Sequence, residues 1–220
     1  MKLLLVVILG SALAACGGSN TSFSARVGAP AANLRGNGAP DALTLSSGIV
    51  VSRVRIVLQR IQLKLDETAD NGKDGELKVG PFLADFSGAA LDGGSPSRIF
   101  DADVPKGTYK RIKFKVHKVE DADATTLGLT EMKAKSVVID GTVDGVAFSW
   151  ASSLDEEQER KGTFVIGGGD NLTFNFNPTG WFTKFGARLD PRDTKNQSDI
   201  EKNIKDSLDC YDDDDGDGKR

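Results

Sequence analysis

The sequence is poor in the residues that most often carry catalysis or bind soft metals. Its 220 residues include one histidine, His117, and two cysteines, Cys16 and Cys210. A single histidine argues against a His-rich zinc site and against a Ser-His-Asp triad. We therefore expect no enzyme. Hydrolase activity stays a minor alternative, because a glycosidase needs only two carboxylates and sequence spacing cannot position them.

Long apolar runs are also scarce. The sequence has one, and it lies at the N-terminus. It extends over Leu3–Leu9 behind the basic Lys2, and the segment ends L-A-A-C at residues 13–16. A membrane-spanning helix needs about 20 apolar residues, so this run is too short. Its layout is that of a secretory signal, and we expect residues 1–15 to be a signal peptide.

The L-A-A-C ending resembles the bacterial lipobox, in which the cysteine is diacylated on sulfur and becomes the mature N-terminus. Cys16 would then hold the protein at a membrane through its diacylglyceryl group. An ordinary cleaved signal with an incidental cysteine is the alternative. Gly17 stands where an aspartate would favour retention at the inner membrane, so we expect the outer membrane of a Gram-negative bacterium. With Cys16 lipidated, Cys210 has no partner for an internal disulfide, and we expect it to be free.

The composition changes twice along the mature chain. Residues 16–41 hold Gly, Ser, Asn, Ala and Pro with few apolar residues, and we expect a lipidated cysteine followed by a flexible tether. Residues 42–190 are long enough for one domain with a core of its own. Residues 191–220 are expected to form a C-terminal helix and an acidic tail.

Apolar and polar residues alternate along most of the central domain. Ile112, Phe114 and Val116 alternate with a basic set, and the Asp144–Gly145 pair between two such runs predicts a two-residue hairpin turn. Further runs lie at 50–65, 77–86, 98–104, 135–142, 146–150, 163–166 and 172–176. About seven to eight short strands with turns at this spacing predict an all-β fold, closed as a two-layer antiparallel β-sandwich.

The first long strand changes its parity. Val50, Val54, Ile56 and Leu58 are even-numbered, whereas the apolar residues at 61, 63 and 65 are odd-numbered. A regular strand cannot keep both sets on one face. An extra residue near Gln59-Arg60 would restore the register, so a β-bulge is predicted there.

The C-terminal part predicts one helix. Ser198 followed by Glu201 is typical of a capping box, and Ile200, Ile204 and Leu208 would lie on one face that packs against the sandwich. Three aromatic residues precede this helix, and we expect them to cover the open end of the core: Trp181, Phe182 and Phe185.

Three stretches in succession resemble a known family. They are GPFLADFSG at 80–88, VPKGTYKRIKFKV at 104–116 and IDGTVDGVAFSW at 139–150, followed by NPTGWF and a helix that runs into DDDDGDG. The set resembles a family of bacterial lipoproteins related to a domain of unknown function (number four-three-eight-two). The resemblance implies a β-sandwich of the prealbumin or carbohydrate-binding type and an envelope location, and we expect a prealbumin-like or Ig-like arrangement of the strands. It implies no activity.

Two features could bind a ligand. Arg111, Lys113, Lys115 and His117 form a basic row on one strand, which could meet lipopolysaccharide phosphates or an acidic polysaccharide, or could be the solvated side of a sheet. Trp181 could stack on a sugar or could close the core. The net charge of −4 is modest, and we expect no nucleic-acid partner.

The acidic C-terminus matches half of a calcium-binding loop. Asp213, Asp215 and Asp217 stand at loop positions 1, 3 and 5, and Lys219 could give its carbonyl at position 7. The bidentate acid of position 12 is missing. The segment is therefore either a weak Ca²⁺ site or a solvated acidic tail.

Three function classes follow. The first is a non-catalytic envelope or surface lipoprotein that binds a glycan or a protein. The second is a structural envelope component with a weakly calcium-responsive C-terminal loop. The third is a hydrolase. The first is the prediction that the sequence favours, because no residue pattern supplies an acid, a base or a nucleophile.

Overall fold

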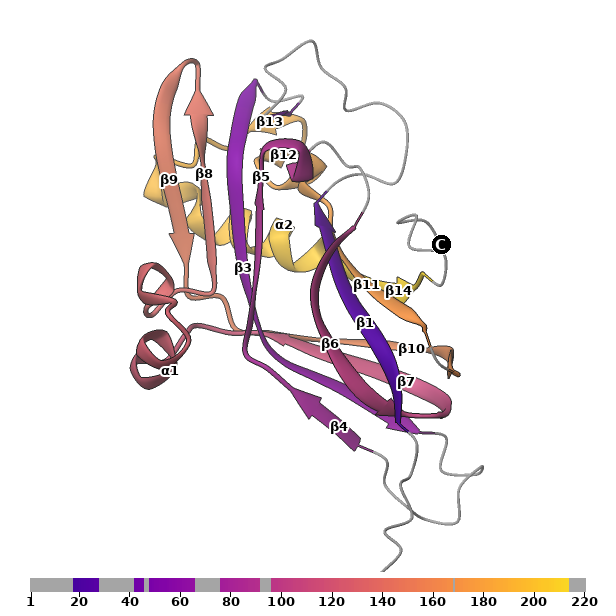
Figure 1. The fold of residues 1–220 in the computed structure, drawn as a ribbon. Coiled ribbons are helices and arrows are strands. Elements are labelled where there is room, and N and C mark those ends of the chain that lie inside the picture. The colour runs from indigo at the N-terminus through magenta and orange to yellow at the C-terminus, as the bar shows by residue number, and fades with distance from the viewer. Residues whose placement is uncertain are drawn as a thin grey trace, which may run out of the picture.

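A computed structural model describes residues 18–27, 42–45, 48–65, 76–91, 96–167 and 169–213. Most of these residues lie in β-strands, so the expected all-β class is confirmed (Figure 1). The strands form an eight-stranded sheet, a four-stranded sheet and a small two-stranded sheet. Among the described residues, none of the helices has the length and apolar character that crossing a bilayer requires.

The eight-stranded sheet is built around one long central strand, β3 (Ile49–Leu65). All strands that pair with β3 are antiparallel to it. Its first half pairs with β8 on one side and β5 on the other, and its second half pairs with β7 and β4. The bounds of its partners and of the outer strands are β2 (Leu43–Thr44), β4 (Glu76–Val79), β5 (Phe82–Ser87), β7 (Gly107–Val116), β8 (Val137–Val143), β9 (Val146–Ser152) and β10 (Glu156–Ile166).

The predicted bulge in β3 is confirmed. The register between β3 and β7 shifts between Leu58 and Arg60, so that Leu58 and Ile61 are both fully buried although their parity differs. A second shift, between Val51 and Arg53 in the pairing with β8, was not predicted. Because of it the buried residues at the start of β3 are Ile49 and Val51 rather than Val50.

The Asp144–Gly145 turn joins β8 to β9 as predicted. The apolar run at 77–86 is interrupted, however. It divides into β4 and β5 at the cis peptide bond between Gly80 and Pro81, and the two pieces pair with different halves of β3.

The four-stranded sheet has the order β14 (Leu208–Asp212), β11 (Asn171–Phe176), β1 (Gly18–Val27) and β6 (Ser97–Pro105). β1 and β11 run parallel, an exception to the expected antiparallel architecture. The prediction that 16–41 is a flexible tether is wrong for residues 18–27, since Phe23, Ala25 and Val27 are fully buried there. The predicted C-terminal acidic tail does not begin directly after the C-terminal helix. Residues Leu208–Asp212 form β14 there, which pairs with β11 in this sheet.

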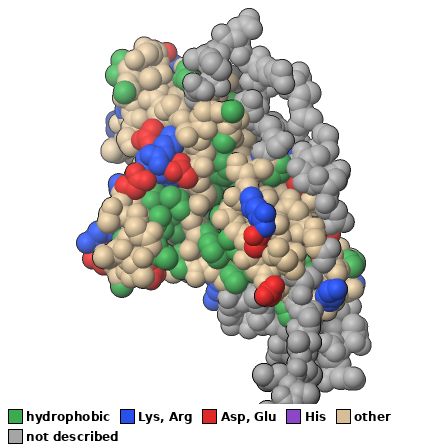
Figure 2. Space-filling model, viewed as in Figure 1, with side chains coloured by type: hydrophobic (Ala, Val, Ile, Leu, Met, Phe, Trp, Pro, Cys, Tyr) green, Lys and Arg blue, Asp and Glu red, His purple; other side chains and the backbone are tan. Residues whose placement is uncertain are grey.

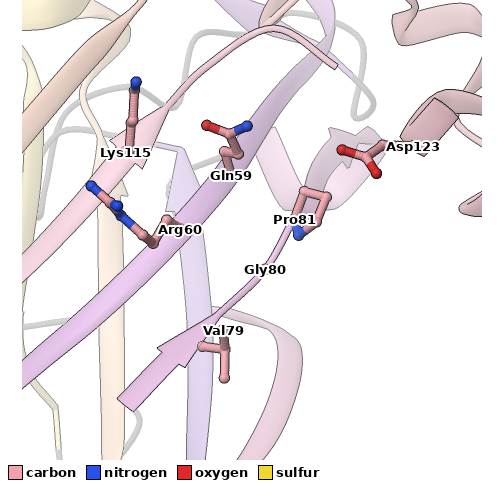
Figure 3. A pocket seen from close by; sticks show the side chains of 7 residues that line it. All are labelled: Gln59, Arg60, Val79, Gly80, Pro81, Lys115 and Asp123. Atoms are coloured by element: carbon pink, nitrogen blue, oxygen red, sulfur yellow. The ribbon is translucent and has the colours of Figure 1, made fainter. Parts of the chain in front are cut away.

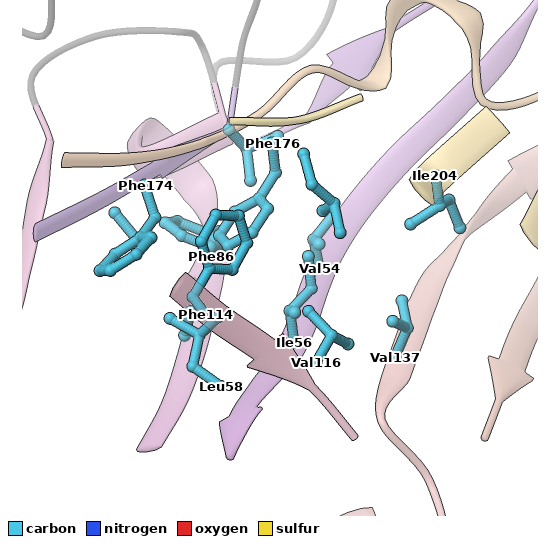
Figure 4. Close-up of a cluster of buried hydrophobic side chains, with 14 of the residues drawn as sticks. Val54, Ile56, Leu58, Phe86, Phe114, Val116, Val137, Phe174, Phe176 and Ile204 are labelled. Carbon is cyan, nitrogen blue, oxygen red and sulfur yellow. The ribbon is translucent and has the colours of Figure 1, made fainter. Parts of the chain in front are cut away.

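One apolar core joins the two sheets (Figure 4). Phe114 of β7 and Phe174 of β11 meet edge to face, with ring centroids 5.2 Å apart. Phe86 of β5 and Phe176 of β11 meet in the same way at 6.1 Å. Such pairs contribute about 0.5–1.5 kcal/mol beyond the burial of their area. These four rings stand at alternating positions of their strands, as the period-two pattern predicts.

The C-terminal helix, α2 (Gln197–Asp206), is confirmed, and its Ile200 and Ile204 are buried in the same core. The capping box is wrong: the helix begins one residue before Ser198, and its N-cap, Asn196, makes no side-chain capping bond. The remaining short elements are α1 (Asp121–Thr126), β12 (Thr183–Lys184), β13 (Ala187–Arg188) and four 3-10 turns, η1 (Gly88–Leu91), η2 (Thr130–Met132), η3 (Pro178–Gly180) and η4 (Thr194–Asn196).

Candidate functional site

The basic row of β7 faces away from the core, but an acidic row lies beside it. β10 pairs antiparallel with β7 and carries Glu157 and Glu159 on the same outer face. Lys113 Nζ lies 3.0 Å from Glu157 Oε1 and 3.4 Å from Glu159 Oε2. Arg111 Nε lies 3.6 Å from Glu159 Oε1. The structure thus brings the predicted basic residues together and pairs them with acids, which the β7 pattern by itself did not reveal.

These pairs change the protonation equilibria of the face. The hydrogen bond from Lys113 holds the pKa of the Glu157 carboxyl below its usual range, and the Glu157 carboxylate in turn raises the pKa of Lys113. Lys115 donates to Asp155 at 3.0 Å and lowers the pKa of that carboxyl. On the side of the molecule that Figure 2 shows, basic and acidic side chains also lie beside one another rather than forming a patch of one sign.

His117 belongs to the same row. Its Nδ1 lies 3.2 Å from Asp155 Oδ2, and its Nε2 lies 3.4 Å from Glu120 Oε1. The ring is on the outer face as predicted, but its side chain is only 18 % exposed. It therefore packs between two carboxylates and is not freely solvated.

A pocket of about 400 Å³ opens where β3 bends. The bulge divides β3 into two halves. On the edge that faces β4 and β5, the first half pairs with β5 up to Leu58 and the second half pairs with β4 from Ile61. The edge of β3 is therefore open at Gln59 and Arg60, between these two strands. In Figure 3, Arg60 and Lys115 lie on one side of this pocket and Pro81 and Asp123 on the other, with Gln59 between them. Val79 and Gly80 complete the lining.

Gly80 is required by this geometry. Its φ is +131°, and a Cβ built on it would lie 2.2 Å from the carbonyl oxygen of Gln59. Only glycine adopts this backbone conformation without strain and also permits so close an approach. The dipeptide Gly80-Pro81 is the sequence signal for this site, but the apolar run at 77–86 predicted a continuous strand there.

The pocket offers hydrogen-bonding groups of both kinds. Arg60, Lys115 and the Gln59 amide can donate, and Asp123 and the Gln59 carbonyl can accept. Arg60 Nη2 also lies 2.8 Å from Glu157 Oε2, at an exposed position. None of the lining residues is a serine, cysteine or histidine. The arrangement is suited to binding a polar ligand.

A small second core lies on the outer face above β3 and β8. Val57, Val119, Ala124, Met132 and Val138 form it, where α1 and η2 cover the sheet. At its edge Arg55 is 8 % exposed and bridges Glu131 and Asp140, each at 2.5 Å. Arg55 is the buried member of both ion pairs, whereas the side chains of Glu131 and Asp140 are 48 % and 28 % exposed. This cluster fixes α1, and through α1 it fixes Asp123 at the pocket.

The structure changes the interpretation of Trp181. Its side chain is fully buried, and its Nε1 donates to Ser207 Oγ at 2.7 Å. A buried ring cannot stack on a sugar, so that prediction is wrong, and the alternative of a core-closing residue holds. Phe182 is buried beside it, whereas Phe185 is 99 % exposed at the β12–β13 turn and covers nothing in the core.

The predicted lipid and calcium residues lie mostly outside the described residues. These are Cys16, Asp215, Asp217 and Lys219. Asp213 is 2 % exposed, and its Oδ2 accepts hydrogen bonds from Thr173 Oγ1 at 2.7 Å and Asn171 Nδ2 at 3.4 Å. Calcium would have to compete with both donors. No group of three or more His, Cys, Asp or Glu side chains within the described parts of the chain could hold a metal ion, so the calcium loop stays a prediction.

Cys210 is a free thiol that is buried in β14. Burial raises its pKa far above the ordinary value. The thiolate is the reactive form of cysteine, so this side chain is chemically inert in the folded protein.

Comparisons of the chain with protein-family models, with curated proteins and with solved structures found no match. The resemblance to the lipoprotein family therefore stays a prediction.

Proposed function

We propose that this chain is an exported envelope lipoprotein, anchored through diacylglyceryl-Cys16 in the outer membrane of a Gram-negative bacterium, and that it binds a ligand without transforming it. The apolar run, the L-A-A-C ending and Gly17 support the location. Mass spectrometry of the native protein tests the anchor. A peptide that starts at Cys16 and carries acyl chains is expected, and an unmodified thiol there would refute this part.

We further propose that the body is a β-sandwich of the prealbumin or Ig-like type. Two sheets that share one apolar core support this. The parallel pairing of β1 with β11 departs from a purely antiparallel arrangement. Sandwiches of this kind present loops and strand bends as binding surfaces on a rigid scaffold.

The pocket at the bend of β3 is the observation that carries the proposed binding function. Its volume of about 400 Å³ lies within the range of small-ligand sites. Planar donors and acceptors from Gln59, Arg60 and Asp123, beside the apolar ring of Pro81, suit the hydroxyl groups and the ring carbons of a sugar. We propose a glycan as the ligand class, with Lys115 contacting any acidic substituent.

Binding of defined glycans to the chain from Cys16 to Arg220 tests this proposal by array and then by calorimetric titration. Lys115→Ala should weaken binding about tenfold, or about 1.4 kcal/mol. Lys113→Ala is the matched control, because Lys113 has the same charge on the same face and does not line the pocket. Equal losses in both variants would show that face charge alone attracts the ligand. No glycan binding at all would remove the proposed ligand class.

A further inference from the structure

The start of β1 determines how far the protein can lie from its anchor. β1 begins at Gly18 and pairs with β6 from that residue, and from Ser22 onward it also pairs with β11. Cys16 is therefore separated from the folded sheet by one residue, Gly17. Two residues of fully extended chain span at most about 7 Å. An acylated Cys16 thus cannot act through a long tether.

One end of the molecule is consequently nearest the anchor. Gly18 pairs with Pro105 at the end of β6, and β7 begins two residues later, where Gly107 pairs with Ile166 of β10. We call Gly18, residues 105–107 and residues 165–167 the anchor end. In Figure 1 the strands β1, β6 and β7 reach this end together at the bottom, while the β8–β9 turn lies at the top.

The anchor end carries side chains that a membrane interface accepts. Pro105 and Lys106 are exposed at the β6–β7 turn, and Val165 is 55 % exposed on β10. Asp103 is exposed nearby, so charge of one sign does not dominate this surface. The short covalent connection to Cys16, rather than electrostatic attraction, is what places it at a bilayer.

We infer that the anchor end rests on the lipid bilayer and that the opposite end, with the β8–β9 turn and the exposed Phe185, points away from it. This inference rests on the proposed anchor at Cys16. β3 runs from the far end at Ile49 to the anchor end at Leu65. At about 3.3 Å per residue, and because β3 bends, the far end lies at most about 50 Å from the anchor end. The pocket at Gln59 and Arg60 then lies at most about 20 Å from the anchor end, open to molecules in the aqueous space.

Photo-crosslinking to lipid headgroups tests this orientation. The chain from Cys16 to Arg220 is coupled through Cys16 to a maleimide lipid in vesicles of phosphatidylethanolamine, phosphatidylglycerol and a headgroup-diazirine lipid. Coupling is selective, because Cys210 is 3 % exposed. Crosslinks within residues 105–107 and 165–167 should exceed those within 144–146 and 183–188 at least tenfold. Equal labelling of both ends, or more at 183–188, would overturn the inference.

A matched variant isolates the short connection as the cause. Inserting 20 Gly and Ser residues between Gly17 and Gly18 should reduce the tenfold difference to about twofold or less, with the same urea unfolding midpoint. An undiminished difference would contradict the role of the short connection. Because the lipid is attached chemically, this result does not depend on acylation in the cell. The mass spectrometry of native protein decides that point separately.

Discussion

At the scale of single residues, Gly80 determines whether β4 and β5 can follow the bend of β3. Gly80→Ala would place a Cβ 2.2 Å from the Gln59 carbonyl oxygen at a φ of +131°. We expect a loss of more than about 3 kcal/mol in the free energy of unfolding, measured by urea titration. Gly145→Ala is the control, since its φ is +79° but nothing lies within 4 Å of the added Cβ. Its cost should be about 1–2 kcal/mol. Equal costs would show that the close approach is relieved by small movements.

Asp190 gives a prediction on acid stability. Hydrogen bonds from the Arg192 side chain and backbone hold the pKa of the Asp190 carboxyl at about 2, below its ordinary value of 3.8. The folded state therefore binds this proton less readily than the unfolded state, so the pair stabilises the protein above pH 3.8 and this contribution is lost as the pH falls toward 2. Asp190→Asn should lower stability at pH 6 and flatten the decline between pH 4 and 2. Arg192→Gln should flatten it similarly, and an unchanged pH profile in both variants would contradict the assignment.

At the scale of elements, β1 is a core strand in a segment whose composition predicted a tether. It contributes Phe23, Ala25 and Val27 to the core and separates β11 from β6. A chain that begins at residue 28 should therefore lose cooperative unfolding in urea, monitored by circular dichroism, whereas one that begins at Gly18 should keep it. Cooperative unfolding in both chains would mean that β1 is dispensable.

The C-terminal acidic segment gives a prediction about calcium affinity. Asp213 is already bound by Thr173 and Asn171, so any calcium affinity of this segment should be weak, with a dissociation constant of about 10⁻⁴–10⁻³ M. Calorimetric titration of the chain should give heat that disappears in the Asp215→Ala, Asp217→Ala double variant. Identical curves for the two proteins would end the metal hypothesis.

Local patterns predicted the elements of this fold better than their partners. The alternation through Ile112, Phe114 and Val116 identifies a strand, and the parity change beyond Leu58 locates the bulge, because both depend only on neighbouring residues. β1 also alternates, through Phe23, Ala25 and Val27, but its Gly, Ser and Asn neighbours resemble a linker by composition.

The candidate site was predictable only in part, because it depends on contacts between distant strands. Arg111, Lys113 and Lys115 follow from one strand, whereas their acidic partners lie in β10 or directly before it, and no local pattern encodes the pairing of β10 with β7. The pocket combines the bulge of β3 with Pro81 and with Asp123 of α1. No single stretch of sequence contains these three parts.

At the scale of the whole molecule, the two sheets and α2 share one core. Trp150 lies in β9, and Trp181 lies against α2 through Ser207, so the two indoles report on different parts of it. We expect the urea transitions measured by tryptophan fluorescence and by far-ultraviolet circular dichroism to coincide. Trp150→Phe and Trp181→Phe isolate each reporter. Separate transitions would show that the C-terminal part unfolds on its own.

The parallel ladder between β1 and β11 joins residues 22–27 to residues 171–176. Ser24 donates a hydrogen bond to Asn171, 147 residues away. One edge of β1 can pair with β6 once residues 97–105 have been made, whereas its other edge stays open until β11, at residues 171–176, is present. If the chain is exported as proposed, this open edge would postpone closure of the four-stranded sheet until β11 has crossed the membrane.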